Sequence, residues 1–95
     1  MTQHELKLSY KHFDAINNGI RTFDIRKYNE KYRIGDTIRY DCVDEDNKTI
    51  LVPNYRANTD TPLKVYVAIV YILTHEDHTA IEEGYCVLGI KKMMG

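Results

Sequence analysis

Apolar and polar residues alternate over residues 21–26, which read Arg-Thr-Phe-Asp-Ile-Arg. A period of two is typical of a β-strand with one buried face and one polar face. We therefore expect Phe23 and Ile25 to face a core. Asp24 and Arg26 are expected to project together from the opposite face of the same strand.

The rest of the pattern predicts one helix and several further strands. Phe13 and Ile16 are spaced like the apolar stripe of a helix. Ser9 is a suitable cap before them, and an Asn-Asn-Gly stop follows them, so residues 10–18 are expected to be helical. Further strands are expected at residues 4–8, 37–43, 49–52, 64–73 and 86–90.

One of these strands, residues 64–73, is apolar on both faces. That pattern predicts a central strand covered on both sides, or a barrel strand with a helix outside it. Residues 54–62 are polar and without period, which predicts a loop, and residues 74–83 form a polar connection with room for one helical turn.

One helix with five or six short strands predicts an α+β domain built on a small, curved, mostly antiparallel sheet or a partly open barrel. The residues expected in its core are Phe13, Phe23, Ile25, Ile38, Val67, Ile69, Val87 and Leu88.

Length and composition narrow the class of protein. The chain has 95 residues, which predicts one domain, and its net charge of −1 favours nucleic-acid binding only if basic residues gather on one face. There is no apolar run long enough for a membrane helix, and the polar N-terminus is unlike a signal peptide, so we expect a cytoplasmic protein. Cys42 and Cys86 are expected to be reduced core residues.

The first candidate site is the polar face that Arg21, Asp24 and Arg26 share with Lys7 of the first strand. An arginine can bind a phosphate or carboxylate through two parallel hydrogen bonds. Asp24 can either orient Arg26 or accept a hydrogen bond from the exocyclic amine of a base. The alternative is a sheet face with salt bridges and no ligand.

The second candidate combines aromatic and basic residues, a mixture that suits single-stranded nucleic acid. Its members are Tyr28, Lys31, Tyr32 and Arg33, with Tyr55 and Arg56 from the long loop. For Tyr32 we favour packing at the mouth of the barrel, together with Ile34. For Tyr28 and Tyr55 both interpretations stay open.

Metal binding is the weakest hypothesis. His75 and His78, with Glu76 and Asp77 between them, have a spacing that can meet on a helix, but no third ligand is well placed. We therefore favour a solvated loop and expect neither a metal nor a cofactor. His4 is interpreted either as a buried, hydrogen-bonded histidine or as a wall of a cleft.

Three motifs carry a resemblance to a known family. Residues 19–26 fit Gly-x-Arg-Thr-Phe-Asp-x-Arg, a Gly-Asp pair follows at residues 35–36, His-x-Leu-Lys stands at residues 4–7, and Gly-Tyr-x-Val-Leu-Gly-Ile at residues 84–90. Together they resemble ASCH domains of the PUA-like superfamily, most closely a compact bacterial and phage ASCH-like family of unknown function. The resemblance leaves out residues 44–62 and implies a PUA-like β-barrel flanked by one or two short helices.

The resemblance also implies a function, because ASCH domains are thought to use this central strand to line a cleft for RNA or a nucleotide-like ligand. Our preferred prediction is a non-enzymatic module that binds single-stranded RNA or a nucleotide. The expected ligand-binding residues are Lys7, Arg21, Asp24, Arg26, Tyr28 and Arg56. The oligomeric state stays open.

Two other functions are kept. Some ASCH proteins with a similar motif are amidohydrolases that remove acyl groups from the N4 amine of cytidine, with Lys and Thr where this chain has Arg21 and Asp24. Arginine cannot readily lose a proton, which weakens that prediction, and the remaining catalytic candidates are Lys7, Asp24 and Glu82. The related family also has Asn-Asp-Arg at residues 28–30, where this chain reads Tyr-Asn-Glu. The third possibility is a protein-interaction module of a phage or mobile element.

Overall fold

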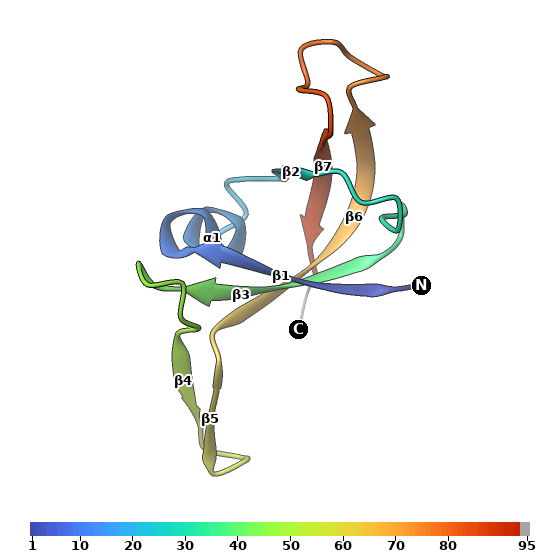
Figure 1. Ribbon diagram of the computed structural model, residues 1–95. Coiled ribbons are helices and arrows are strands. Elements are labelled where there is room, and N and C mark those ends of the chain that lie inside the picture. Colours follow the sequence, from blue (N-terminus) through green and yellow to red (C-terminus); the bar gives the residue numbers. More distant parts are fainter. Residues whose placement is uncertain (94–95) are drawn as a thin grey trace.

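The computed structural model describes residues 1–93, which contain one helix and seven strands. In chain order the elements are β1 (Gln3–Ser9), α1 (Tyr10–Asn17), β2 (Phe23–Lys27), β3 (Thr37–Val43), β4 (Leu51–Asn54), β5 (Thr59–Pro62), β6 (Lys64–Thr74) and β7 (Tyr85–Lys92). The strands β4 and β5 form a separate hairpin that projects away from the main sheet (Figure 1).

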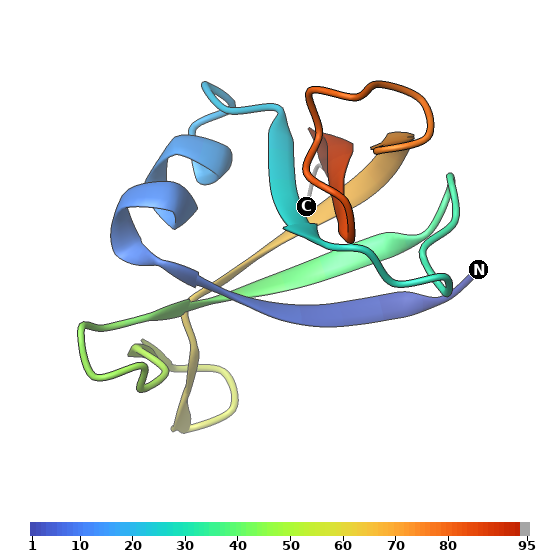
Figure 2. The same ribbon diagram turned by 45° about the horizontal axis from the view of Figure 1, so that its top comes forward.

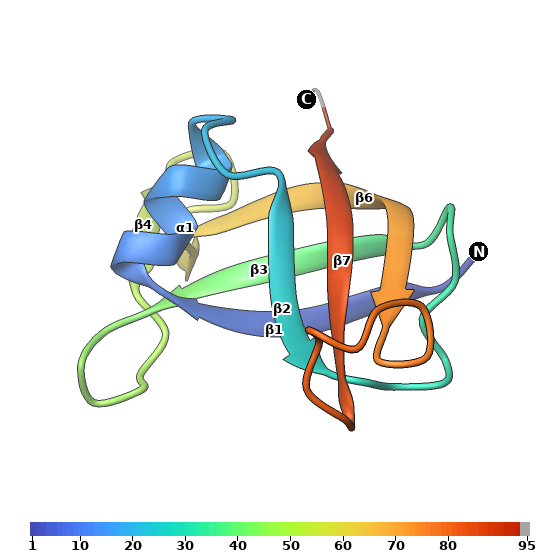
Figure 3. The ribbon, with the colours of Figure 1, turned by 90° about the horizontal axis from the view of Figure 1, so that it is seen from above.

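The main sheet has five strands in the order β1-β3-β6-β7-β2. Among the strand pairs of the described residues in this sheet, only β1–β3 is parallel. The long strand β6 is central, as predicted, and pairs with β3 near its start and with β7 towards its end, so it carries the sheet around a bend. The sheet curls into a half-barrel, in which β2 and β7 run across β1 and β3 (Figure 3). This confirms the predicted α+β class with a small curved sheet.

The concave side of the sheet forms the core. The helix α1 closes one end of the half-barrel and buries Phe13 and Ile16 there, as predicted (Figure 2). Of the other predicted core residues, the following are buried: Ile38, Val67, Ile69 and Leu88. Val87 is half-buried on the outer side. Both cysteines lie unpaired in the core, as predicted, and burial raises the pKa of each thiol.

The predicted orientation of β2 is wrong. Asp24 is only 2% exposed and points inward, whereas Phe23 and Ile25 are 46% and 57% exposed on the outside. Neighbouring residues of a strand point to opposite faces, so a wrong choice of the inner face misplaces every side chain of β2. The inward orientation is stable because the hydroxyl of Tyr40, on the facing wall of the half-barrel, donates a hydrogen bond to the carboxylate of Asp24.

Both alternatives predicted for β6, a strand covered on both faces and a barrel strand with a helix outside it, are also wrong. Val65, Val67 and Ile69 are buried, but Tyr66 and Tyr71 are exposed on the outer face. The reason is that α1 packs on the concave side and leaves the convex side of the sheet bare.

Two connections differ from the sequence patterns. The predicted loop at residues 54–62 contains β5, which pairs with β4 around a turn where Asn54 Oδ1 accepts hydrogen bonds from the N–H groups of Arg56 and Ala57. Residues 75–84 form hydrogen-bonded turns without a helical segment. Among the described residues, no helix is long and apolar enough to cross a membrane.

Candidate functional site

The candidate site is a cleft between the two edge strands of the half-barrel, β1 and β2, and we call it the seam cleft. Its volume is about 560 Å³. It is lined by Leu6, Lys7, Leu8, Ser9, His12, Arg21, Asp24, Ile25, Arg26, Lys27, Tyr32 and Tyr85. Four of the residues predicted to bind ligand, Lys7, Arg21, Asp24 and Arg26, thus lie at one cleft.

Asp24 is the central hydrogen-bond acceptor of this cleft. Its Oδ2 atom accepts hydrogen bonds from Tyr40 Oη at 2.8 Å and from Arg26 Nε at 2.7 Å, and its Oδ1 atom lies 3.5 Å from Arg21 Nη2. Burial and the neighbouring Asp24 carboxylate raise the pKa of Tyr40, so Tyr40 keeps its proton and remains a donor. The carboxylate therefore orients two guanidinium groups, Arg26 through a short hydrogen bond and Arg21 through a longer contact.

Arg26 links the two edge strands, β2 and β1, across the seam cleft. Besides Asp24, its guanidinium donates from Nη2 to the backbone oxygen of Lys7 at 2.6 Å and lies 5.7 Å from the centre of the Tyr40 ring. These contacts fix the plane of the guanidinium. Within residues 1–93 its Nη1 atom makes no hydrogen bond, so a donor is left for a ligand.

Arg21 is held just as firmly. Its Nε donates to the backbone oxygen of Phe23 at 2.8 Å, and its guanidinium lies 4.9 Å from the centre of the Phe23 ring. Nη1 is 2.6 Å from Nδ1 of His12, and because arginine has no acceptor, the histidine accepts. In this contact the Nδ1 atom of His12 is therefore an acceptor.

Lys7 reaches the seam cleft only at its rim. In β1 its neighbours Leu6 and Leu8 face inward, so the Lys7 side chain lies on the outer face, in register with Asp41 of β3. Its backbone oxygen, not its ammonium group, contacts Arg26. The Lys7 ammonium group and the Asp24 carboxylate therefore lie on opposite faces of the sheet.

A comparison with protein families matches residues 3–90 to the family described as "Domain of unknown function (DUF3850)". The chain belongs to this family. The match runs from β1 into β7 and so includes both walls of the seam cleft in this DUF3850 domain. The comparison with curated proteins found no relative that matches.

The remaining predicted ligand-binding and catalytic residues of the DUF3850 domain lie outside the seam cleft. Tyr28 is half-exposed after β2 and lines a smaller neighbouring cavity of about 230 Å³, which shares Tyr85 with the seam cleft. Glu82 is exposed in the connection between β6 and β7. Arg56 and Tyr55 lie at the tip of the β4–β5 hairpin, at the opposite end of the molecule from that connection (Figure 1).

His4 is a hydrogen-bonded histidine whose side chain is 10% exposed, which is closer to the first of its two interpretations. Its Nε2 lies 2.9 Å from Asp36 Oδ2, and its ring meets the buried ring of Tyr32 edge-on at 4.8 Å. The hydrogen bond from His4 and that from the Thr2 N–H lower the pKa of Asp36. Tyr32 packs at the mouth of the half-barrel as expected, whereas Ile34 is exposed.

The histidines of the β6–β7 connection take part in local hydrogen bonds. His75 Nδ1 lies 2.6 Å from the oxygen of Ile81, and His78 Nδ1 accepts from the N–H of Ala80. Across residues 1–93, no group of three or more potential metal ligands comes together.

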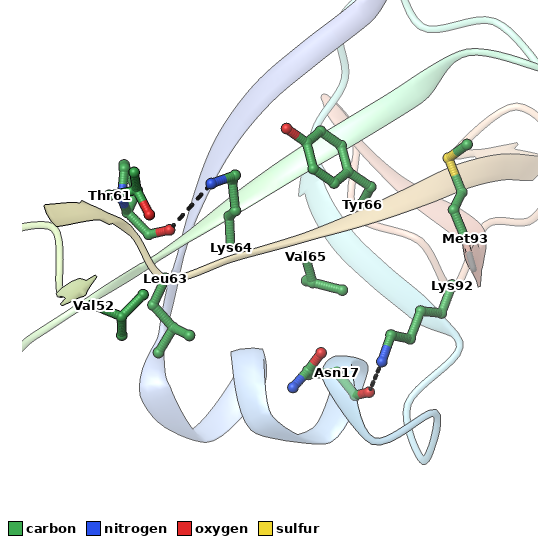
Figure 4. Close-up of a pocket in the computed structure, with 10 residues that line it drawn as sticks. Asn17, Val52, Thr61, Leu63, Lys64, Val65, Tyr66, Lys92 and Met93 are labelled. Atoms are coloured by element: carbon green, nitrogen blue, oxygen red, sulfur yellow. Dashed lines mark hydrogen bonds between the residues drawn. The ribbon is translucent and has the colours of Figure 1, made fainter. Parts of the chain in front are cut away.

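A second large cavity, of about 570 Å³, lies between the C-terminal end of α1 and the start of β6 (Figure 4). Its two lysines are engaged with the backbone: Lys92 Nζ donates to the oxygen of Asn17 at 2.8 Å, and Lys64 Nζ lies 3.5 Å from the oxygen of Pro62. Because Lys92 satisfies a carbonyl in the last turn of α1, it has a structural role there.

Two residues that contact Asp24 and Arg21 were missed in the sequence. Tyr40 carried one available signal, since a tyrosine on the buried face of a strand needs a partner for its hydroxyl group. No signal in the sequence marked His12, because its contact with Arg21 depends on how α1 is placed against the chain that leads into β2.

Proposed function

We propose that this DUF3850 domain is a non-enzymatic RNA- or nucleotide-binding module of the ASCH, PUA-like type, with its ligand in the seam cleft. One observation carries the proposal: buried Asp24 holds the guanidinium groups of Arg21 and Arg26 together at the wall of a cleft of about 560 Å³. Oriented guanidinium groups suit phosphate oxygens, because their planar forks match the geometry of the anion.

The charge balance of the cleft supports an anionic ligand. Two arginines share one carboxylate, so positive charge is in excess at the wall of the cleft. This local excess contrasts with the net charge of −1 for the whole chain. Clefts lined by one sign of charge concentrate ligands of the other sign.

Asp24 has an orienting role in this proposal. Of the two roles considered for it in the sequence, holding Arg26 is favoured over reading a base, because Asp24 presents no free edge to the cleft: it is only 2% exposed and its Oδ2 atom accepts from Arg26. Specificity for a base must then come from other groups around the cleft.

The resemblance to ASCH domains adds independent support, since it implies a ligand cleft along the strand that carries Arg21 and Arg26. The amidohydrolase alternative has no specific observation in its favour. Its candidate Lys7 has its ammonium group on the outer face, away from Asp24.

The test is a fluorescence-anisotropy titration of the pure protein with short single-stranded RNA and with a mononucleotide. Arg26→Lys keeps the positive charge but loses the planar fork, and we expect it to weaken binding by roughly tenfold or more. Lys48→Ala, in the turn after β3, is the matched control and should bind like the parent. Equal affinities for parent and Arg26→Lys would refute the proposed site.

A further inference from the structure

The outer face of the sheet carries two exposed rings in one row. Phe23 of β2 is paired with Gly89 of β7, and Gly89 is paired with Tyr71 of β6, so the three residues share one face. Phe23 is 46% exposed and Tyr71 is 57% exposed. A Cβ atom at Gly89 would lie 3.1 Å from Tyr71 Cβ, so glycine permits the close approach of Tyr71. Two strand spacings put the rings about 10 Å apart.

A β-bulge turns Tyr71 to this face. In a regular strand Tyr71 would point the same way as Ile69, which is 1% exposed in the core. The register shifts between Ile69 and Tyr71, and as a result both Val70 and Tyr71 are exposed. Bulges are commonly found where a strand must redirect a side chain for function.

The same face is basic. The strands β2, β6 and β7 contain one acidic residue, Asp24, and it points into the core. Lys91 is two residues beyond Gly89 on the same side of β7, and the guanidinium of Arg21 lies over the Phe23 ring. Exposed rings beside cations are the combination that binds single-stranded nucleic acid, where bases stack and phosphates pair with cations.

We infer that this outer surface, which we call the stacking face (Phe23, Tyr71, Arg21 and Lys91), binds single-stranded nucleic acid by stacking bases on the two rings. The inference deepens the proposed function and rests on it. Arg21 connects the two surfaces, because its guanidinium contacts both Asp24 in the seam cleft and the ring of Phe23. A strand that crosses the edge of β2 therefore contacts both, which makes the ligand an oligonucleotide and not a single nucleotide.

A second copy of the chain fits this surface less well. A two-fold contact is self-complementary, so it would bring each cation of the stacking face close to cations of the partner. The strands of this face offer no exposed carboxylate to compensate that repulsion. An anionic ligand meets no such repulsion.

The test compares Phe23→Ala and Tyr71→Ala with the control Tyr10→Ala, which removes an exposed tyrosine from α1. The ligands are an unstructured RNA of about ten nucleotides, a usual site size for such surfaces, and a mononucleotide. Each stacking-face variant should bind the RNA roughly 5- to 150-fold more weakly than the parent, the usual effect of losing one stacked base. The control should bind like the parent.

A fluorescent reporter separates stacking from general loss of binding. The chain has no tryptophan, so Tyr71→Trp introduces a single indole whose emission should be quenched as the RNA is added. Parent-like RNA affinity in both alanine variants, or an unquenched indole in the RNA complex, would overturn the inference. Self-association that is lost in Phe23→Ala would also overturn it, in favour of a second copy.

The two proposals can fail separately. If Arg26→Lys weakens binding while Phe23→Ala and Tyr71→Ala bind like the parent, the seam cleft stands and the stacking face is wrong. If the alanine variants weaken RNA binding while Arg26→Lys binds like the parent, the seam cleft is wrong as the primary site. We expect all three to weaken RNA binding, and only Arg26→Lys to weaken binding of the mononucleotide.

Discussion

The orientation of β2 decides which of two neighbouring substitutions, Phe23→Ala or Asp24→Ala, lowers the free energy of unfolding more. Phe23→Ala removes a ring that is 46% exposed. A fully buried phenylalanine contributes about 1.5–3 kcal/mol by transfer from water. Because the Phe23 ring is about half exposed, its removal should lose roughly half of that free energy. Loss of the contact with Arg21 adds about 0.5–1 kcal/mol. No closed cavity forms at the surface, so we expect a loss of about 1–2 kcal/mol in the free energy of unfolding.

Asp24→Ala should cost more, although the removed side chain is small. It leaves the Tyr40 hydroxyl and two guanidinium groups without their acceptor. Breaking a buried charge pair costs about 3–5 kcal/mol, and because both arginines keep some contact with water we expect about 3 kcal/mol. The opposite strand orientation predicts the reverse order, about 3–5 kcal/mol for Phe23→Ala and under about 1 kcal/mol for Asp24→Ala.

Urea unfolding at neutral pH distinguishes the two orientations, since the midpoint and the slope together give the free energy of unfolding. Ile20→Ala is the control, because Ile20 is 81% exposed and should change stability little. If Phe23→Ala proves more destabilising than Asp24→Ala, the inward placement of Asp24 is refuted, and with it the orientation of both arginines.

Three further outcomes are expected. Tyr40→Phe should lower the free energy of unfolding by about 1.5–3 kcal/mol, because the buried carboxylate loses a donor, and a change within about 0.5 kcal/mol would contradict this. The pKa of Asp36 is lowered from its ordinary value of 3.8, so its stabilising effect is present above that pH and is lost as the pH falls below it. Acid unfolding of Asp36→Asn should therefore be less steep than that of the parent, and identical pH profiles would contradict this. Cys42 and Cys86 should react with a thiol reagent only after unfolding, because they are buried with raised pKa values; rapid reaction of the native protein would contradict this.

Much of the fold could be predicted because it depends on local signals. The helix stripe of Phe13 and Ile16, with its glycine-containing stop, fixes α1 almost to the residue. The orientation of β2 could not be predicted in the same way, because an alternating pattern does not tell which face is inside. The decision depends on Tyr40, sixteen residues away, whose hydroxyl stabilises a carboxylate in the core.

The sequence also predicted part of the candidate site, namely the residues that are neighbours in the chain. Arg21, Asp24 and Arg26 are close in the chain, so β2 and the residues just before it bring them together whichever way the strand faces. Arg56 was expected at the rim of the cleft, but the predicted loop is a hairpin that carries it away from the seam. The stacking face was hidden by the same error, because Phe23 was expected in the core and the bulge that turns Tyr71 outward leaves no mark in the apolar pattern of β6.

The most direct test of the proposed function observes the arginine side chains themselves. In a nitrogen-15 NMR titration with short single-stranded RNA, the Nε–H signals of Arg21 and Arg26 should shift in proportion to occupancy, and the signal of Arg56 should stay in place. The affinity should fall as the salt concentration rises, because the arginines displace counterions from the phosphates that they bind. RNA binding that leaves the Arg21 and Arg26 signals unmoved, or an affinity that does not change with salt, would contradict the seam cleft as the ligand site.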